Sequence, residues 1–276
     1  MLIGAGEIIR RSYHLYRANF RMYFKYILLN FVPGILSLAL FLIAIPMTFS
    51  VLFVDKTLAI SLGMVIILFS IILSVVGLWL NFAFIKAISY GYTNTPAGTL
   101  LDNLKKSVRV LLKGIATTIM VNIYALWPMF ATMLLYFIIS TLLTKFGIQS
   151  FTTIIRVTFL LLFFYSFFHL VRYYIKLVFA LFEAVIYSAP VKKSLTESQV
   201  LVVGRWWSIL WRIVAPMFVF WIISVVASGI LAQTGTQIGG IMDTILGILA
   251  VLVNILIAPL FATAMVILFH EAEHKV

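Results

Sequence analysis

The sequence predicts an all-α polytopic membrane protein whose six transmembrane helices form three tandem repeats, each an interfacial amphipathic helix followed by a transmembrane hairpin. The first observation behind this prediction is composition: 64% of the 276 residues are hydrophobic, 10% are charged, and the mean hydropathy is +1.16. In soluble proteins about a quarter of the residues are charged. The second observation is a series of long apolar stretches, and the third is a set of motifs that recurs three times.

Six stretches are long enough to cross a bilayer, which takes about 20 predominantly apolar residues. They cover residues 27–53, 58–85, 115–143, 153–171 with an extension to 187, 208–231 and 241–269. The first 25 residues lack the short apolar core and cleavage site of a removable signal peptide, so we expect the first span to remain in the mature protein. The chain has no cysteine, which excludes disulfides and thiolate metal sites.

Lysine and arginine are distributed unequally between the two sides of the predicted membrane protein. Seventeen lie in the N-terminal segment, in the second and fourth connections or in the tail, whereas the opposite side has only Lys56, Lys145 and Arg156. The positive-inside rule therefore predicts that the N- and C-termini are both cytoplasmic. The net charge of +12 is then a topology signal. Because no loop is long enough to form a basic soluble domain, we expect no nucleic-acid partner.

Three sequence features recur in the same order along the chain. A pair of basic residues precedes a serine at Ser12, Ser107 and Ser194. A proline follows each serine by 21, 21 and 22 residues, at Pro33, Pro128 and Pro216. Near the end of each unit stands a Phe-Ala pair, at residues 82–83, 179–180 and 261–262. We therefore predict three repeats of the same orientation, covering residues 5–92, 93–188 and 189–276.

Each predicted repeat begins with a segment whose apolar residues recur at helical spacing. In the second repeat, Thr95 as a cap and Pro96 in the first turn predict a helix over residues 95–114. In the third, Ser188 and Pro190 predict the start of a helix and Gly204 its end. We expect these amphipathic helices to lie in the headgroup layer, with the apolar side down and the basic residues near anionic lipids.

Two passages resemble a known family. They are GEIIRRSYHLYRANF at the N-terminus and SLTESQVLVVGRWWSIL before the fifth span. Both are similar to the corresponding passages of the membrane domain of glycerophosphoryl diester phosphodiesterases and of related uncharacterised prokaryotic six-helix membrane proteins. The resemblance implies a six-helix fold in the plasma (inner) membrane of a bacterium or archaeon. It does not imply phosphodiesterase activity, because a separate soluble barrel domain performs catalysis in that family, and we expect no such domain here.

The fourth predicted span and its extension contain the candidate residues for binding a lipid or an anion. His169, Arg172 and Lys176 lie near one helical face, together with Glu183, and Arg205 precedes the next span. A charge inside the membrane costs roughly 2.5–3.5 kcal/mol on insertion scales, so one interpretation is an inward-facing basic pocket for the phosphate or carboxylate of a lipid headgroup. The other interpretation is that the side chains snorkel to the interface at the end of a tilted helix.

Four asparagines lie within or at the ends of the predicted spans. In such positions an asparagine either lines a polar path or forms hydrogen bonds across helices that hold the bundle together. The sequence leaves both interpretations open. The four residues are Asn30, Asn81, Asn122 and Asn254.

The tail HEAEH matches the metalloprotease pattern H-E-x-x-H, in which two histidines one turn apart bind zinc and the glutamate activates water. The ligands would be His270 and His274, with Glu273 as a further candidate and Glu271 as the base. Because no downstream ligand follows, we predict no metal site and no cofactor. A membrane zinc metalloprotease is an outside alternative.

The sequence shows no Ser-His-Asp constellation, no phosphate-binding glycine loop and no paired carboxylates, so we assign no catalytic residue. We expect non-enzymatic binding, scaffolding or translocation of an anionic lipid or amphiphile at the cytoplasmic leaflet, with membrane lipids as the partners. A small-solute transporter or channel is the main alternative.

Overall fold

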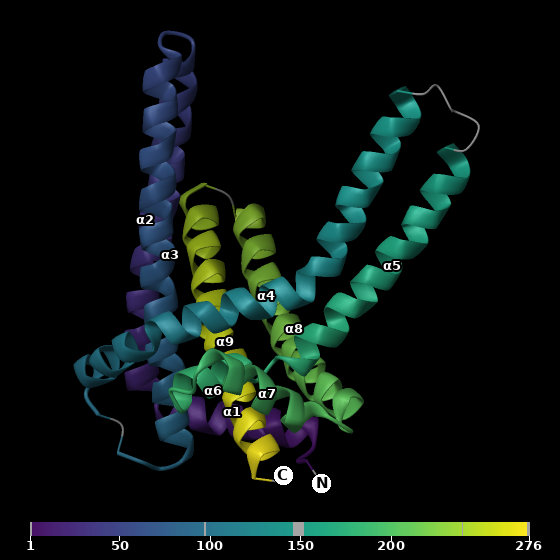
Figure 1. Cartoon of the computed structure of the whole chain (residues 1–276). Coiled ribbons are helices and arrows are strands. Elements are labelled where there is room, and N and C mark those ends of the chain that lie inside the picture. Colours follow the sequence, from purple (N-terminus) through teal and green to yellow (C-terminus); the bar gives the residue numbers. More distant parts are fainter. Residues whose placement is uncertain (1, 97, 146–151, 239, 275–276) are drawn as a thin grey trace. The chain divides into compact units, whose positions relative to one another are not determined.

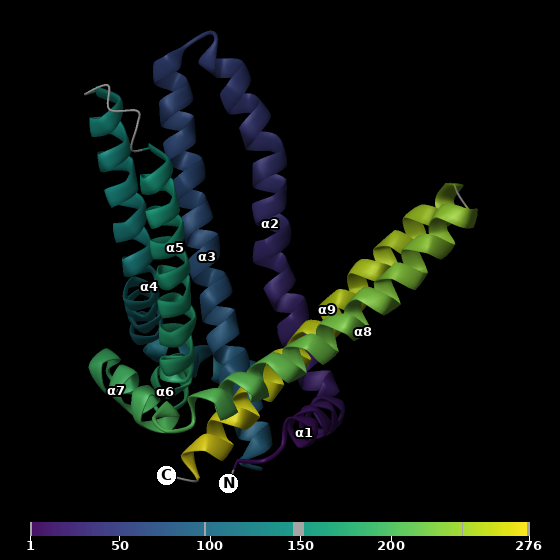
Figure 2. The ribbon, with the colours of Figure 1, turned by 90° about the vertical axis from the view of Figure 1, so that its right-hand side faces the viewer.

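A computed structural model of the chain describes residues 2–96, 98–145, 152–238 and 240–274. Over these residues all regular structure is α-helical (Figures 1 and 2). The helices are α1 (Ala5–Ala18), α2 (Phe20–Leu52), α3 (Lys56–Tyr92), α4 (Leu100–Lys145), α5 (Thr152–Lys176), α6 (Ala180–Ile186), α7 (Val191–Val202), α8 (Trp206–Ile238) and α9 (Gly240–Glu273).

Six helical stretches are long and apolar enough to cross a membrane. They correspond to α2, α3, α4, α5 with α6, α8 and α9, which confirms the predicted all-α class with six stretches that could span a membrane in the described part of the chain. Several helices extend beyond the predicted spans. For example, α2 begins at Phe20, and its first two turns contain basic and aromatic residues of the kind that membrane helices carry at their ends.

The prediction of a separate connecting helix over residues 95–114 is wrong, because α4 runs from Leu100 to Lys145 without interruption. The predicted start at Thr95 and Pro96 is also wrong. The backbone N–H of Thr99 donates to Asp102 Oδ2 at 3.1 Å, and the N–H of Asp102 donates to Thr99 Oγ1 at 3.3 Å. This reciprocal capping box, Thr-x-x-Asp, starts the helix at the following residue.

The other two connecting helices are separate elements. Asn19 interrupts the helical backbone between α1 and α2. Helix α7 begins after Pro190, and Gly204 lies between α7 and α8 with φ +74°. Glycine adopts such a left-handed backbone without steric cost, so the predicted helix end at Gly204 is confirmed.

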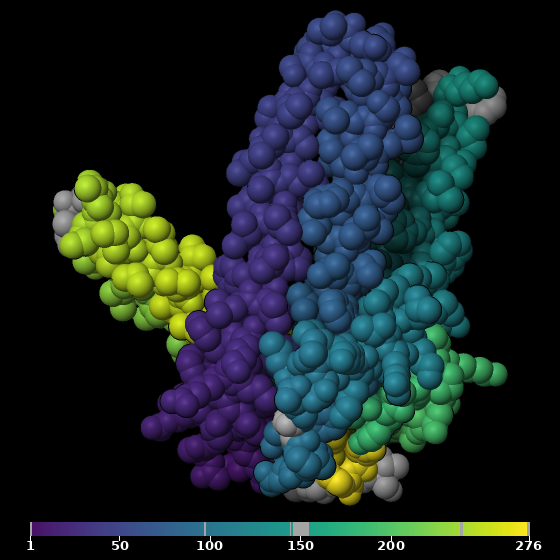
Figure 3. Space-filling view, turned by 90° about the vertical axis from the view of Figure 1, so that its left-hand side faces the viewer, coloured from purple at the N-terminus to yellow at the C-terminus, as the bar shows by residue number. Residues whose placement is uncertain are grey.

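The chain forms two compact units, which are described separately. Unit 1 comprises residues 1–112 and 211–276. Within it, α2 and α3 pack against each other as a hairpin (purple to blue in Figure 3), and α9 contacts α1, α2 and α3. Arg212 donates to the backbone carbonyls of Leu2 and Ile3, which fixes the start of the chain to α8. The N- and C-terminal helices therefore lie at the same end of unit 1.

The buried interior of unit 1 is concentrated at this end. Every residue of the stretches 82–89 in α3 and 263–272 in α9 is buried, whereas most apolar side chains elsewhere on the spanning helices are exposed. The largest fully buried side chains include Tyr23, Tyr26, Phe82 and Phe269. Such a distribution is expected when the exposed apolar surface faces lipid and the buried part lies where water would otherwise reach it.

Unit 2 comprises residues 113–210, with α6 and α5 packed on α7. The extension predicted to residue 187 forms the separate helix α6, because the helical backbone is interrupted between Lys176 and Ala180. Ser198 of α7 satisfies backbone groups at this interruption: its Oγ donates to the carbonyl of Lys176 at 3.0 Å and accepts from the N–H of Phe179 at 3.1 Å.

Candidate functional site

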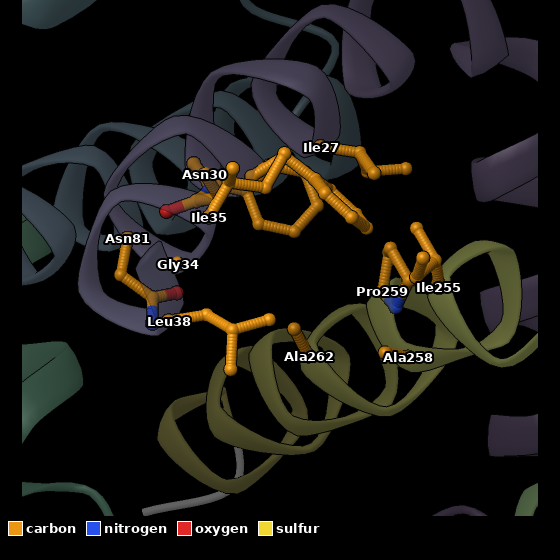
Figure 4. A pocket seen from close by; sticks show the side chains of 12 residues that line it. Ile27, Asn30, Gly34, Ile35, Leu38, Asn81, Ile255, Ala258, Pro259 and Ala262 are labelled. Carbon is orange, nitrogen blue, oxygen red and sulfur yellow. The ribbon is translucent and has the colours of Figure 1, made fainter. Parts of the chain in front are cut away.

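A pocket of about 600 Å³ lies between α2, α3 and α9 of unit 1 (Figure 4). Its lining is mostly apolar, and among the described residues that line it the polar side chains are the carboxamides of Asn30 and Asn81. The remaining lining residues are Ile27, Phe31, Gly34, Ile35, Leu38, Phe84, Ile255, Ala258, Pro259 and Ala262.

The pocket exists because small residues face it from both sides. On α2, the lining residues recur at helical spacing and therefore share one face, at the middle of which Gly34 has no side chain. A Cβ added to Gly34 would have nothing within 4 Å. On the opposite wall, α9 presents Ala258, Pro259 and Ala262 (Figure 4). The three helices therefore leave a space that larger side chains would fill.

The two carboxamides of the pocket lie on its α2–α3 side, opposite α9 (Figure 4). Asn30 Nδ2 donates to the Tyr26 carbonyl within α2 at 3.1 Å. In the part of the chain that the structure describes, Asn81 makes no hydrogen bond, and its side chain is exposed to the pocket. The pocket thus offers an apolar surface with hydrogen-bonding groups at one side.

The other two asparagines of the predicted spans, Asn122 and Asn254, form hydrogen bonds between helices. Asn122 Oδ1 accepts a hydrogen bond from the Tyr174 hydroxyl, which joins α4 to α5 in unit 2. Asn254 Oδ1 accepts from the Ser224 hydroxyl, which joins α9 to α8 in unit 1. The cross-helix interpretation is therefore confirmed for these two residues, whereas Asn30 and Asn81 line a cavity.

The predicted lipid- or anion-binding residues lie at one end of unit 2. The His169 ring stacks on Tyr173 with the ring centroids 4.3 Å apart, and Lys176 Nζ is 5.3 Å from the centre of the same ring. Trp206 Nε1 donates to the Arg172 carbonyl at 3.3 Å. Since Arg205 directly precedes Trp206, this bond places Arg205 at the same end of unit 2 as Arg172.

The positive charges at this end have no acidic partner among the described residues: Arg172, Lys176 and Arg205 form no ion pair there. His169 Nδ1 is buried without a hydrogen-bond partner in the same set of residues. The prediction that Glu183 shares their helical face is wrong, because Glu183 lies in α6, beyond the interruption after Lys176. The arrangement is a basic helix end with unneutralised charge.

The C-terminal motif holds the terminal helices of unit 1 together. Glu271 Oε1 accepts from Arg11 Nη1 at 2.8 Å and from the Tyr92 hydroxyl at 3.0 Å. Ser89 Oγ and His270 Nε2 are 2.9 Å apart, and the His270 ring stacks on Tyr92. These contacts join α9 to α1 and α3.

Arg11 also pairs with Glu7 one turn earlier in α1, at 2.8 Å. The guanidinium groups of Arg11 and Arg10 lower the pKa of the Glu7 carboxyl, because both donate hydrogen bonds to it. The Glu7 carboxylate in turn raises the pKa of Arg11. Arg11 is therefore held in its charged form between two carboxylates.

The geometry does not support the zinc alternative. His270 Nε2 is engaged by Ser89, and Glu271 by Arg11 and Tyr92. Across residues 2–274, outside the gaps in the description, no group of three or more His, Cys, Asp or Glu side chains could hold a metal ion.

The same residues contain one arrangement that the sequence did not reveal. A serine, a histidine and a carboxylate follow one another as in a catalytic triad: Ser89 Oγ contacts His270 Nε2, and His270 Nδ1 is 3.7 Å from Glu273 Oε2. However, Ser89 and His270 are only 4% and 3% exposed, so a substrate carbonyl cannot reach the hydroxyl in this conformation. The hydrogen bond between Ser89 and His270 instead connects α3 to α9, across 181 positions of the sequence.

No protein-family model matches the sequence, and neither a curated protein nor a solved structure gives a match. The resemblance to the membrane domain of glycerophosphoryl diester phosphodiesterases therefore stays a prediction.

Proposed function

We propose that this protein binds an anionic lipid or amphiphile in the cytoplasmic leaflet of a prokaryotic inner membrane, without enzymatic activity. The observation on which the proposal rests is the pocket between α2, α3 and α9 in unit 1. Its volume of about 600 Å³ lies within the range of ligand sites, roughly 300–1,000 Å³. An apolar lining with a few polar groups is also the usual composition of such sites.

The chemistry of the lining favours a ligand with a hydrocarbon part and a hydrogen-bonding group. The helix faces around the pocket are exposed and apolar, so an acyl chain can enter from the bilayer, while Asn30 and Asn81 can bind an ester or hydroxyl group. The pocket lies in the halves of α2, α3 and α9 near the end that carries both termini, and the predicted topology assigns that end to the cytoplasm.

Charge at this end favours an anionic ligand. Helix α2 begins with a turn that contains Arg21 and Lys25, both exposed. Each basic residue near a membrane surface contributes about 1 kcal/mol to the attraction of anionic lipids. Unit 2 has a separate candidate site for an anionic headgroup, at Arg172, Lys176 and Arg205. The lack of acidic partners for these residues among the described residues supports that role.

We further propose that the six spans derive from three tandem repeats. The structure supports this with a shared feature of the three motif serines. Ser12, Ser107 and Ser194 are all fully buried, and each hydroxyl donates to a carbonyl of the preceding turn, at 2.8, 2.8 and 3.2 Å. The motif prolines lie inside α2, α4 and α8, the outgoing helix of each repeat.

Replacing Gly34 by leucine is expected to reduce lipid retention at the pocket at least tenfold, because the new side chain occupies the space that the ligand needs. Leucine has a higher helix propensity than glycine, by up to about 1 kcal/mol, and nothing within 4 Å opposes its Cβ, so the variant should fold. The measurement is native mass spectrometry of the purified protein released from phosphatidylglycerol-containing nanodiscs.

The matched control is Gly63→Leu in α3, where a Cβ also meets nothing within 4 Å and which does not line the pocket. Equal lipid retention by the Gly34 and Gly63 variants would contradict the proposed function. A solute flux through proteoliposomes that Gly34→Leu abolishes, without any change in lipid retention, would instead establish the transporter alternative.

The double substitution Arg172→Ala/Lys176→Ala is expected to weaken binding of phosphatidylglycerol vesicles by about 30-fold. The reason is that two basic residues at about 1 kcal/mol each contribute about 2 kcal/mol, and 1.4 kcal/mol is a factor of ten. Vesicle binding is measured against zwitterionic phosphatidylcholine, which should be unaffected.

Lys192→Ala/Lys193→Ala in α7 is the control for the basic helix end, because it removes the same charge from two exposed positions of the same unit. If both pairs weaken binding equally, the basic residues act only through the general charge of the surface. That result would support the snorkelling interpretation and contradict headgroup binding by Arg172 and Lys176 in unit 2.

A further inference from the structure

Unit 2 contains a second hollow, between the halves of α4 and α5 that lie toward residues 145 and 152. Two cavities of about 440 Å³ each adjoin at Tyr136 and Phe137, which line both. One lies between α4 and α5, and the described lining of the other comes from α4; together they form one groove. We call it the outer groove. Its lining residues on α4 begin at Thr132 and end at Lys145, and those on α5 begin at Arg156 and end at Phe163. Its lining is mainly aromatic and aliphatic, with polar side chains near one end.

Contacts between α4 and α5 close one end of the outer groove. The hydroxyls of Thr132 and Ser166 are 2.8 Å apart, and Ser166 is 2% exposed. One turn further along α4, the rings of Tyr136 and Phe159 meet edge to face with their centroids 4.9 Å apart. One cavity lies beside these contacts, with Met133 on α4 and Phe163 on α5 also in its lining, and the other continues past them along α4 to Lys145.

The open part of the outer groove is positively charged. Arg156 lines one cavity and Lys145 lines the other, and both side chains are exposed. The sequence has no aspartate or glutamate between Asp102 and Glu183, so neither cation has an acidic residue on these helices. Only three of the 20 lysines and arginines are predicted to lie on the outer side of the membrane, and two of them line this groove.

We propose that the outer groove binds one anionic phospholipid of the outer leaflet. An acyl chain would lie along Phe137, Phe159 and Phe163, with the phosphate at the level of Arg156 and Lys145. Guanidinium and ammonium groups form charge-assisted hydrogen bonds with phosphate, and these are about twice as strong as neutral ones. This site goes beyond the proposed function, because it lies on other helices and the predicted topology assigns it to the opposite leaflet.

The test measures phosphatidylglycerol that stays bound to the full chain in native mass spectrometry after release from nanodiscs. Arg156→Gln removes the charge, and Met133→Trp fills the groove without changing the charge. Each is expected to reduce occupancy of one bound phosphatidylglycerol about tenfold. Lys56→Gln is the matched control, because Lys56 is an exposed basic residue on the predicted outer side that lines none of these cavities.

The site is overturned if Arg156→Gln and Met133→Trp both retain as much phosphatidylglycerol as Lys56→Gln. Its failure is distinguishable from failure of the proposed function, because Gly34→Leu should remove a different bound lipid and act additively with Arg156→Gln. Sidedness has its own measurement. The chain contains no cysteine, so Lys145→Cys introduces a single thiol. An impermeant maleimide should label it from outside intact cells, and protection until lysis would overturn the assignment to the outer leaflet.

Discussion

Replacement of Phe269 by alanine is expected to destabilise unit 1 by about 3–5 kcal/mol, the usual cost of removing a buried aromatic ring. Phe269 is fully buried in the stretch of α9 where every residue from 263 to 272 is buried. Because neighbouring helices enclose it, neither lipid nor water fills the space that the ring leaves. The measurement is the free energy of unfolding by SDS titration in mixed micelles.

Phe49→Ala in α2 is the control for this substitution. The Phe49 side chain is 61% exposed on a membrane-spanning helix, so lipid can occupy the space after truncation. The expected change is within about 0.5 kcal/mol, as for surface positions in general. Equal losses from the two substitutions would show that the end of α9 is not enclosed by protein.

Replacement of Gly91 by alanine is expected to destabilise unit 1 by about 1–2 kcal/mol. A Cβ at this position would be 2.8 Å from the Tyr23 hydroxyl oxygen, closer than real Cβ contacts, and Tyr23 is fully buried with its ring against Phe84. Overpacking of this kind costs about 1–3 kcal/mol. The higher helix propensity of alanine offsets up to about 1 kcal/mol of that cost. The same SDS titration measures the net effect.

A double-mutant cycle with Tyr23→Phe gives this prediction its control. The Tyr23 hydroxyl is buried and has no hydrogen-bond partner among the described residues, so its removal should be neutral or stabilising. Removing the hydroxyl also removes the atom that the new Cβ would meet, so Tyr23→Phe should restore most of the stability lost in Gly91→Ala. Gly77→Ala, where a Cβ meets nothing within 4 Å, should not destabilise. Absence of rescue would contradict the predicted clash.

The spanning helices could be predicted from sequence because hydropathy over about 20 residues is a local property. The continuity of α4 could not, because Gly114 lies inside an uninterrupted helix whereas Gly204 ends one. Glycine permits either backbone, and packing decides between them. The start of α4 was predictable in principle: the Thr-x-x-Asp signal at Thr99 and Asp102 is present in the sequence, but Thr95 and Pro96 gave a competing signal four residues earlier.

For the candidate sites, too, the sequence identified individual residues, whereas their grouping depends on how the helices pack. The sequence identified Asn30 and Asn81 as polar residues within spans, but their common pocket depends on how α2, α3 and α9 pack. It identified His169, Arg172 and Lys176 as neighbours because they lie on one helix. Glu183 was misplaced because nothing in the local sequence marked the interruption between α5 and α6, which Ser198 of another helix stabilises.

The pairing of Arg11 with Glu271 joins residues 260 positions apart, so it cannot form until the ribosome has synthesised the chain past Glu271. At a synthesis rate of about 5–20 residues per second, α1 emerges roughly 10–50 s before its partner. During that interval α1 lacks α9, against which it packs in the completed unit. Unit 2 is encoded by one uninterrupted stretch and can be completed earlier. A nascent chain truncated before Glu271 would therefore expose α1, a surface that cellular proteases and chaperones can recognise.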